Sequence, residues 1–232
     1  MTTTYGTFIK QLREEREVSQ AEMANRLGIS RSSYVAIEKG TKELSLSEAE
    51  AIAHIFGMTV DELVLNQKPN YTKYRQMILA YLRAAKKDGK KLKKTKLAKL
   101  LYLADFAWYY EHLESMSGMP YRRISFGPVP NEYFTALEAL EREGYVTVTK
   151  HKREDGTDMY ELAETRASER MSLDTVTSAE EKLMKEVWQN WRDANTEEIV
   201  RFTHEQLPYK LSFDSEIIPY ELITQEDPDN VY

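Results

Sequence analysis

Residues 19–40 read SQAEMANRLGISRSSYVAIEKG, and this stretch decides the fold of the first part of the chain. Ser19 is followed three residues later by Glu22, and this spacing predicts a capping box at the start of a helix. Gly28 predicts the turn that ends it, and Ser30 predicts the N-cap of the next helix. Two short helices joined by a tight glycine turn are typical of a helix-turn-helix.

Helical patterns continue on both sides of this stretch. Apolar residues at helical spacing predict further helices over about residues 5–16, 47–56 and 60–65. The apolar side of each helix is expected to face a shared core. We therefore expect residues 1–66 to form a compact domain of five helices.

The stretch from Ser19 to Ser45 resembles the Cro/C1-type (XRE) helix-turn-helix family. The residues that match the small, apolar, turn and C-cap positions of its pattern are Ala24, Leu27, Gly28, Ile29, Ile37, Glu38 and Gly40. The resemblance covers about residues 8–65 and implies a five-helix, lambda-repressor-like domain that binds operator DNA. Proteins of this kind usually bind as dimers to half-sites about 34 Å apart, so the resemblance also implies a homodimer.

The second helix of such a motif enters the major groove, and the side chains at its N-terminal end meet base edges. Arg31 could chelate O6 and N7 of guanine, whereas Val35 or Ala36 could only touch a thymine methyl group. Gln20, Lys39 and Lys42 are placed to contact phosphates. They belong to the same expected DNA-contacting set. That set is Gln20, Arg31, Ser32, Ser33, Val35, Ala36, Lys39 and Lys42. The alternative is that the small residues serve only as packing and solvent positions.

The formal net charge of −6 is segregated along the chain. It divides into −3 for residues 1–66, +10 for residues 67–110 and −13 for residues 111–232. The run KKDGKKLKKTK at residues 86–96 carries much of the basic block, and such a run is by default a solvated loop and helix start. The block predicts either an electrostatic contact with a polyanion or an internal complement to the acidic remainder.

Residues 67–70, which include Pro69, predict a linker to a second domain over residues 71–225, and residues 226–232 predict an acidic tail. The second domain is expected to be predominantly helical with a small β-hairpin. Residues 95–113 are apolar nearly all round their helix, which predicts a central, buried position. The fold class expected for the whole chain is therefore mainly α.

Asp105 lies within this apolar helix and needs a partner, because an unpaired buried carboxylate is costly. Lys99 and Arg122 are the candidate partners.

Further elements are predicted downstream of this helix. Apolar residues that alternate along the chain, such as Val146 and Val148, predict a hairpin that turns at Asp155 and Gly156. Ser178 with Glu181 predicts a capping box at the start of a later helix. Final helices are expected over about residues 177–191 and 196–207. A helix over residues 131–143 is expected to turn inward Phe134, Leu137 and Leu140.

Several segments of the second domain resemble the Panacea domain, the SocA/GepA-like antitoxin-associated domain. The segments are KLAKLLYLADFAWYY, YRRISFGPVPNEYFTALEALEREGYV, FTHEQLPYK and EIIPYE. The likeness spans about residues 71–222, and its most specific pieces are residues 99–105 and 126–130. Tyr209 departs from the family, which tends to carry Trp there, and only some members have an N-terminal helix-turn-helix. Structural roles are expected for Lys99, Tyr102, Asp105, Gly127, Pro128 and His204.

This resemblance implies an antitoxin whose C-terminal domain neutralises a protein toxin by direct contact. Fusion to a DNA-binding domain suggests that the protein represses its own operon. Some family members are proposed to act as proteolytic adaptors, which suggests that the protein could deliver the toxin to a protease. The candidate toxin contacts are Arg122, Arg123, Phe126, Asn131 and Glu132. The alternative is a transcriptional regulator whose second domain senses a ligand or dimerises.

Other classes of function are disfavoured by the residues. The chain has no Cys, and its 4 His residues show no metal-ligand spacing. It has no glycine-rich phosphate loop and no GxSxG motif, so we expect no enzyme activity, no cofactor and no metal. No run approaches the roughly 20 apolar residues that span a bilayer. We expect a cytoplasmic protein with no membrane partner.

Overall fold

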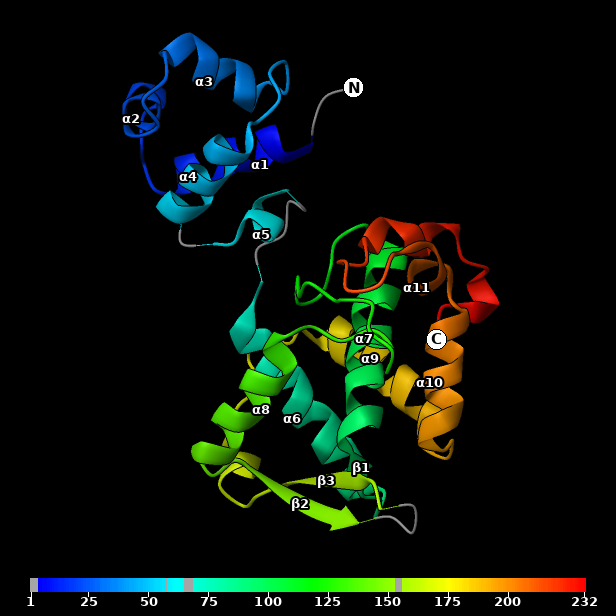
Figure 1. Ribbon diagram of the computed structural model, residues 1–232. Helices are drawn as coiled ribbons and strands as arrows, with labels where there is room; N and C mark the ends of the chain where they lie inside the picture. The colour runs from blue at the N-terminus through cyan, green and yellow to red at the C-terminus, as the bar shows by residue number, and fades with distance from the viewer. Residues whose placement is uncertain (1–3, 57, 65–68, 153–155) are drawn as a thin grey trace. The chain divides into compact units, whose positions relative to one another are not determined.

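The computed structural model describes residues 4–56, 58–64, 69–152 and 156–232 of the chain (Figure 1). The chain divides into two compact units, Met1–Pro69 and Asn70–Tyr232. Both are mainly helical, and the second contains a small antiparallel sheet, so the predicted fold class is confirmed. Three predicted features lie outside the described residues: the Leu65 end of the fifth helix, residues Gln67 and Lys68 of the linker, and Asp155 of the hairpin turn.

The first unit is built from short helices around one core. Its helices are α1 (Thr4–Glu15), α2 (Gln20–Arg26), α3 (Arg31–Glu38), α4 (Leu46–Phe56) and α5 (Val60–Val64). Apolar residues from all of them are buried together, among them Ile9, Met23, Ile37, Ile52 and Leu63. The helix-turn-helix predicted from residues 19–40 is therefore α2 followed by α3.

Local capping explains where α2 and α3 begin. The Ser19 hydroxyl accepts a hydrogen bond from the Glu22 N–H, and the Ser30 hydroxyl accepts one from the Ser33 N–H. The capping box predicted at Ser19 is only half formed, because the Glu22 carboxylate pairs with Arg26. One serine oxygen per helix is enough to satisfy an N-terminal N–H group.

Gly6 allows α1 to lie directly against the end of α3. A Cβ atom at this position would stand 2.5 Å from the carbonyl oxygen of Ile37 and 2.8 Å from that of Glu38. Backbone carbonyls of a helix cannot move aside cheaply, so this close approach requires glycine.

The second unit is built from longer helices and a small sheet. Its helices are α6 (Tyr71–Lys87), α7 (Lys94–His112), α8 (Glu132–Arg142), α9 (Ser178–Trp191), α10 (Thr196–Glu205) and α11 (Leu207–Leu211), with 3-10 turns η1 (Ser168–Arg170), η2 (Tyr220–Gln225) and η3 (Pro228–Asn230). The strands β1 (Leu92–Lys93), β2 (Val146–Lys152) and β3 (Asp158–Glu164) pair antiparallel in the order β1-β3-β2. Leu162 of β3 lies opposite Leu92 on one side and Val148 on the other.

Helix α7 forms the centre of the second unit, as predicted (Figure 1). Every residue from Lys96 to Ala107 is buried, and the helix contacts α6, α9, α10 and η2. A helix surrounded on all sides needs apolar residues all round, which is the pattern of this sequence.

The structure corrects several details of the second unit. The capping box of α9 uses Thr177 and Glu180, one residue before the predicted pair Ser178 and Glu181. Phe134 is 41% exposed instead of inward, while Leu137 and Leu140 are buried as predicted.

The expected helix over residues 196–207 and the expected tail also differ. The first ends at Glu205, and a separate α11 begins with Pro208 in its first turn, since proline lacks the N–H that a continuing helix needs. The segment expected as an acidic tail packs on the unit: Val231 is buried, and the Gln206 side chain donates to the carbonyls of Asn230 and Val231.

Candidate functional site

Helix α3 carries five of the eight residues expected to contact DNA, while Gln20 begins α2 and Lys39 and Lys42 follow α3. Arg31, Ser32 and Lys39 are exposed. Ser33, Val35, Ala36 and Lys42 are half-buried. Lys42 pairs with Glu48, whereas Lys39 has no ion-pair partner within the described part of the chain. The side chains that could reach base edges thus start at the exposed N-terminal end of α3.

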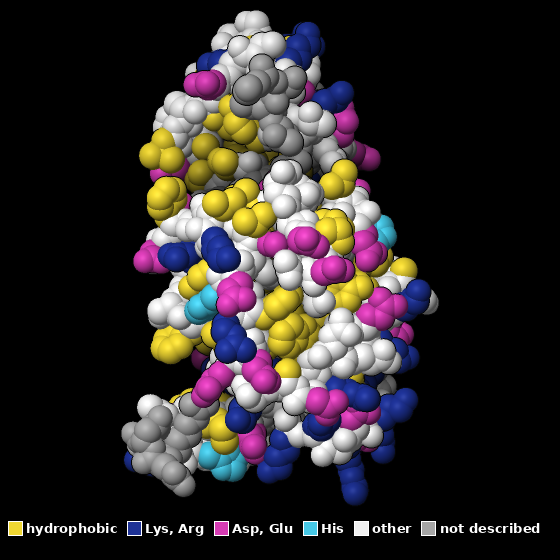
Figure 2. Space-filling model, turned by 90° about the vertical axis from the view of Figure 1, so that its right-hand side faces the viewer, with side chains coloured by type: hydrophobic (Ala, Val, Ile, Leu, Met, Phe, Trp, Pro, Cys, Tyr) yellow, Lys and Arg dark blue, Asp and Glu magenta, His cyan; other side chains and the backbone are white. Residues whose placement is uncertain are grey.

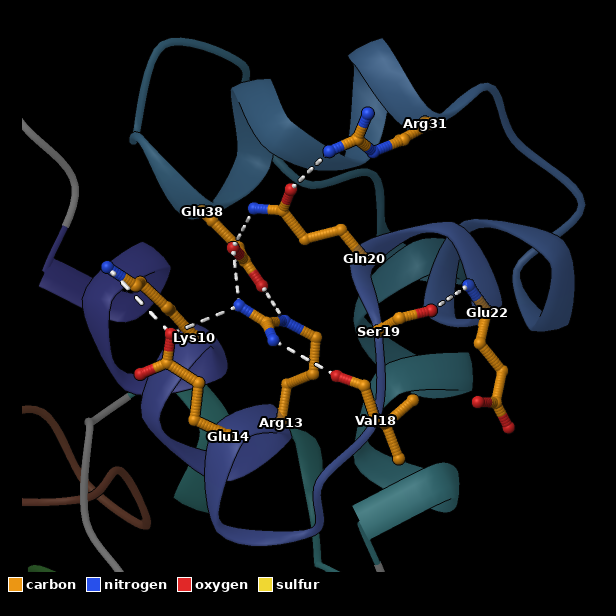
Figure 3. Close-up of polar contacts among 9 residues, drawn as sticks. All are labelled: Lys10, Arg13, Glu14, Val18, Ser19, Gln20, Glu22, Arg31 and Glu38. Atoms are coloured by element: carbon orange, nitrogen blue, oxygen red, sulfur yellow. Dashed lines mark hydrogen bonds and ion pairs between the residues drawn. The ribbon is translucent and has the colours of Figure 1, made fainter.

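A buried ion pair joins α1 to the far end of α3 (Figure 3). The Arg13 guanidinium donates through Nε to Oε1 of Glu38 at 2.6 Å and through Nη2 to Oε2 at 3.2 Å. Arg13 also donates to the carbonyl oxygen of Val18 at 3.0 Å. Burial alone would raise the pKa of Glu38, but the hydrogen bonds from Arg13 and Gln20 hold it below its usual value.

Gln20 extends this network to the start of α3. Its Nε2 donates to Glu38 Oε2 at 2.9 Å, and its Oε1 accepts from Arg31 Nη2 at 3.3 Å (Figure 3). Arg31 is exposed, so this hydrogen bond connects a surface guanidinium to a buried ion pair through one amide. Because both ends of the Gln20 amide are engaged within the unit, its expected contact with a phosphate stays a prediction. Its hydrogen bond with Arg31 is a contact that the sequence pattern did not reveal.

In the second unit, Asp105 finds partners other than the two expected. Its carboxylate accepts from the Ser117 N–H at 2.6 Å, from the Ser117 hydroxyl, and from the Tyr121 hydroxyl at 2.9 Å. The predicted partners Lys99 and Arg122 are therefore wrong. Burial raises the pKa of Asp105 to about 6, against the opposing effect of these hydrogen bonds.

Lys99 is buried on the same helix. Its Nζ donates to the carbonyl oxygen of Pro128 at 2.9 Å, and burial lowers its pKa to about 7. Gly127 has φ +90°, and a Cβ there would stand 2.8 Å from both Lys99 Nζ and His204 Nε2. The positive φ favours glycine, and a side chain at this position would also force the ends of the Lys99 and His204 side chains to shift.

His204 and Tyr102 complete this core. The His204 ring stacks on Tyr209, with ring centroids 4.3 Å apart, and burial followed by the nearby Lys99 and Arg123 lowers the pKa of His204. Tyr102 packs against Phe106, with centroids 4.2 Å apart. Of the residues expected to have structural roles, Lys99, Tyr102, Asp105, Gly127 and Pro128 are buried, and His204 is half-buried.

The expected toxin contacts Arg122 and Arg123 are engaged within the second unit. Arg123 donates through Nε to the Tyr209 carbonyl at 3.0 Å, pairs with Asp214 and lies over the Tyr209 ring. Arg122 Nη1 donates to the Ser215 carbonyl at 3.1 Å. These bonds hold the loop of residues 122–129 against residues 209–217.

Three exposed apolar side chains lie on these two segments. Phe126 is 74% exposed in the loop, while Leu211 and Phe213 are 58% and 74% exposed in the other segment. Asn131, next to α8, is exposed, and Glu132 is half-buried. Sequence reasoning missed Leu211 and Phe213, because an apolar residue gives no sign by itself of which side of a loop will face solvent.

Three lysines of the basic run have acidic partners within the second unit. Lys86 pairs with Glu169, Lys90 with Asp193 at 2.7 Å, and Lys91 with Glu161 at 3.0 Å. The charge pattern left two alternatives for the basic block, a contact with a polyanion or an internal complement to the acidic remainder of the chain. The internal complement accounts for these three side chains.

Within residues 4–56, 58–64, 69–152 and 156–232, no helix is long and apolar enough to cross a membrane. The same residues contain no group of three or more His, Asp or Glu side chains that could hold a metal ion.

Comparison with known proteins gives a match in each unit. The helix-turn-helix family matches residues 9–63, and the antitoxin SocA-like Panacea domain matches residues 97–209. These families are DNA-binding and antitoxin-like and are not enzyme families.

Similar proteins include the cryptic phage CTXphi transcriptional repressor RstR of Vibrio cholerae, 36% identical over 66 residues, which are 28% of this chain and 60% of the relative. The immunity repressor protein of Bacillus phage phi105 is 38% identical over 61 residues, or 26% of this chain and 42% of the relative. The similarity thus spans about half the length of these two repressors. An uncharacterized HTH-type transcriptional regulator of Methanocaldococcus jannaschii is 35% identical over 57 residues, 25% of this chain and 86% of the relative. The helix-turn-helix match and the repressor relatives support DNA-binding transcriptional regulation.

Proposed function

The chain belongs to the family of helix-turn-helix transcriptional regulators and carries an antitoxin SocA-like Panacea domain, and from these two memberships we propose that it is an autorepressing antitoxin. Its second unit binds and neutralises a protein toxin, and its first unit represses the operon that encodes both proteins. The observation that carries this proposal is the joining of the two matched domains in one chain.

The proposed DNA contact centres on Arg31. The surface of α3 enters the major groove, Arg31 bonds a guanine, and Gln20 orients the guanidinium. Lys39 and Lys42 follow α3 and neutralise phosphates. Because half-sites in operators of this kind are read by paired copies, the chain binds as a homodimer.

Replacing Arg31 with alanine is expected to weaken operator binding by about 1–3 kcal/mol and to relax specificity at one base pair. The measurement is a gel-shift titration with the region upstream of the gene and a series of single base-pair variants. Arg26→Ala is the matched control, since it removes one exposed charge from α2 and leaves α3 intact. Unchanged discrimination by the Arg31 variant would exclude it as a base-reading residue.

The proposed toxin contact is formed by the exposed apolar residues of the second unit. Phe126, Leu211 and Phe213 stand on two segments that Arg123 holds together, so a toxin surface can meet them as one preformed site. Aromatic side chains that a partner fully buries commonly carry much of the binding free energy. Asn131 and Glu132 are further proposed contacts at the start of α8.

Growth rescue tests both the antitoxin function and this surface. The wild-type chain is expected to protect cells that express the toxic product of the adjacent gene, and the Phe126→Ser/Phe213→Ser double variant is expected to bind that product more weakly by about 2 kcal/mol or more, with loss of rescue. Leu113→Ser is the control, because Leu113 is 67% exposed at the end of α7.

The outcomes separate the function from the surface. If the wild-type chain does not rescue growth but still binds its operator, the alternative of a regulator with a ligand-sensing or dimerising second unit replaces the antitoxin proposal. If rescue survives in the double variant, the antitoxin function stands and its contact surface lies elsewhere. If rescue requires a host protease, the chain acts as an adaptor that delivers the toxin for degradation.

A further inference from the structure

A cavity of about 250 Å³ lies where the basic run meets the start of α10. Five cationic side chains line it: Lys90, Lys91, Lys93, Lys96 and Arg192. The rest of its lining comes from residues 194–196, and no acidic side chain of the described residues belongs to the lining. Lys and Arg side chains gather at the lower end of the second unit in Figure 2, the end that carries the sheet in Figure 1.

The carboxylates that pair with these cations lie outside the cavity lining. Asp193 pairs with Lys90 and Arg192, but its side chain is 73% exposed, and Lys91 itself is 74% exposed in its pair with Glu161. Arg192 also pairs with Asp88 at 3.4 Å, where the two side chains are 44% and 27% exposed. Exposed ion pairs of this kind are weak and screened by salt. Lys93 has no ion-pair partner among the described residues.

Lys96 fixes the inner wall of the cavity. It is 8% exposed, and its Nζ donates to the carbonyl oxygens of Arg192 and Ala194, just beyond the end of α9. Burial, Lys90 and Lys93 all lower the pKa of Lys96, with Asp193 and Glu198 acting in the opposite direction. The three lysines therefore repel one another, and an anion between them would relieve this repulsion.

The geometry favours a phosphate over a single carboxylate. Four ammonium groups and one guanidinium belong to residues that line the cavity, and such groups donate hydrogen bonds to phosphate oxygens. The cavity also opens at the start of α10, where the Asn195 and Glu198 side chains already cap the helix, so an anion would be held by the lining cations. A ligand with two or more negative charges matches this lining.

We propose that this cavity binds a small polyphosphate anion, such as pyrophosphate. The site lies in the second unit and needs neither the toxin contact nor the operator contact. It gives a use to Lys93 and Lys96, the lysines of the run that line the cavity and that the ion pairs with acidic residues do not account for.

The test is calorimetric titration of the full chain with pyrophosphate, against sodium chloride of the same ionic strength. Saturable binding at one site per chain is expected, and Lys93→Gln is expected to weaken it at least tenfold. Lys87→Gln is the matched control: Lys87 is exposed in the last turn of α6, lies outside this cavity, and its replacement is expected to change affinity less than twofold. The absence of saturable binding, or equal losses in the two variants, would overturn the proposal.

A second arm distinguishes a small ligand from a nucleic-acid backbone. The oligonucleotide d(T)10 offers phosphodiesters, whereas pyrophosphate offers terminal phosphate groups. Pyrophosphate is expected to bind more tightly. If d(T)10 binds more tightly and loses affinity in Lys93→Gln, the cavity is part of a strand-binding surface and the small-ligand assignment is wrong.

Discussion

Replacing Glu38 with alanine is expected to lower the free energy of unfolding of the first unit by about 3–5 kcal/mol. The substitution leaves the Arg13 guanidinium buried without its bidentate partner, and it also removes the acceptor of the Gln20 amide. An uncompensated buried charge costs more than the intact pair contributes, so the loss exceeds that of an ordinary hydrogen bond. Arg31 would lose the support that orients it, and operator affinity would fall as well.

The positions of the tryptophans allow this effect to be measured in the full chain. The 3 Trp residues, Trp108, Trp188 and Trp191, all belong to the second unit. In urea unfolding, Trp fluorescence therefore follows the second unit, and far-UV circular dichroism follows both. The unfolding of the first unit therefore appears in the circular dichroism and not in the fluorescence. Glu38→Ala is expected to shift or abolish only this part of the circular dichroism transition.

Two further variants make the result specific to the buried pair. Glu22→Ala removes one partner of an exposed ion pair and is expected to cost less than about 1 kcal/mol. The double variant Arg13→Met/Glu38→Leu removes both charges and is expected to recover part of the lost stability, because well-packed apolar residues often replace a buried ion pair without loss. A Glu38→Ala effect no larger than that of Glu22→Ala would show that the pair contributes little.

Local signals were sufficient to predict the helices of the first unit, although the capping box predicted at Ser19 is only half formed. Ser30 caps α3, and the apolar spacing places the expected helices around one core, since capping and periodicity depend on residues within a turn or two of each other. The Gln20 to Arg31 hydrogen bond joins two helices, and its geometry depends on their packing angle. No pattern within either helix contains that information.

In the second unit, the errors arise where two local patterns compete. Thr177 and Ser178 both stand three residues before a glutamate, so the spacing alone cannot choose between the two capping boxes. On α8, Tyr133, Leu137 and Leu140 form one stripe at spacings of four and three residues, and this stripe is buried. Phe134 lies beside it, where the Lys94 ammonium stands 4.9 Å from the ring centroid.

The partner of Asp105 could not be found from residue types at all. An acidic residue in an apolar helix suggests a basic partner, yet the carboxylate is satisfied by an N–H group and two hydroxyls. The Ser117 donors come from the segment after α7, which folds back over that helix. This path is set by tertiary packing, and its consequences for stability are large enough to test.

Asp105→Ala is expected to lower the free energy of unfolding of the second unit by about 3 kcal/mol or more. It leaves the Ser117 N–H, the Ser117 hydroxyl and the Tyr121 hydroxyl without their acceptor, and each buried unsatisfied group costs about 1–3 kcal/mol. Asp105→Asn is expected to cost less, because the amide oxygen can accept and the hydroxyls can turn to accept from the amide N–H groups. Urea unfolding followed by Trp fluorescence measures both variants.

The pH dependence distinguishes the charge of Asp105 from its packing. Its pKa is about 6 in the folded chain, above the ordinary 3.8, so the folded state holds the proton more tightly. The stability that this group contributes is therefore fully present below pH 4 and is lost as the pH rises through 6, by about 3 kcal/mol in all. In Asp105→Asn this loss is absent, so the difference in stability between the wild-type chain and the variant should shift in the variant's favour from pH 4 to pH 7. A difference that stays constant over this range would mean that Asp105 titrates normally and that its hydrogen bonds fully offset the cost of burying its charge.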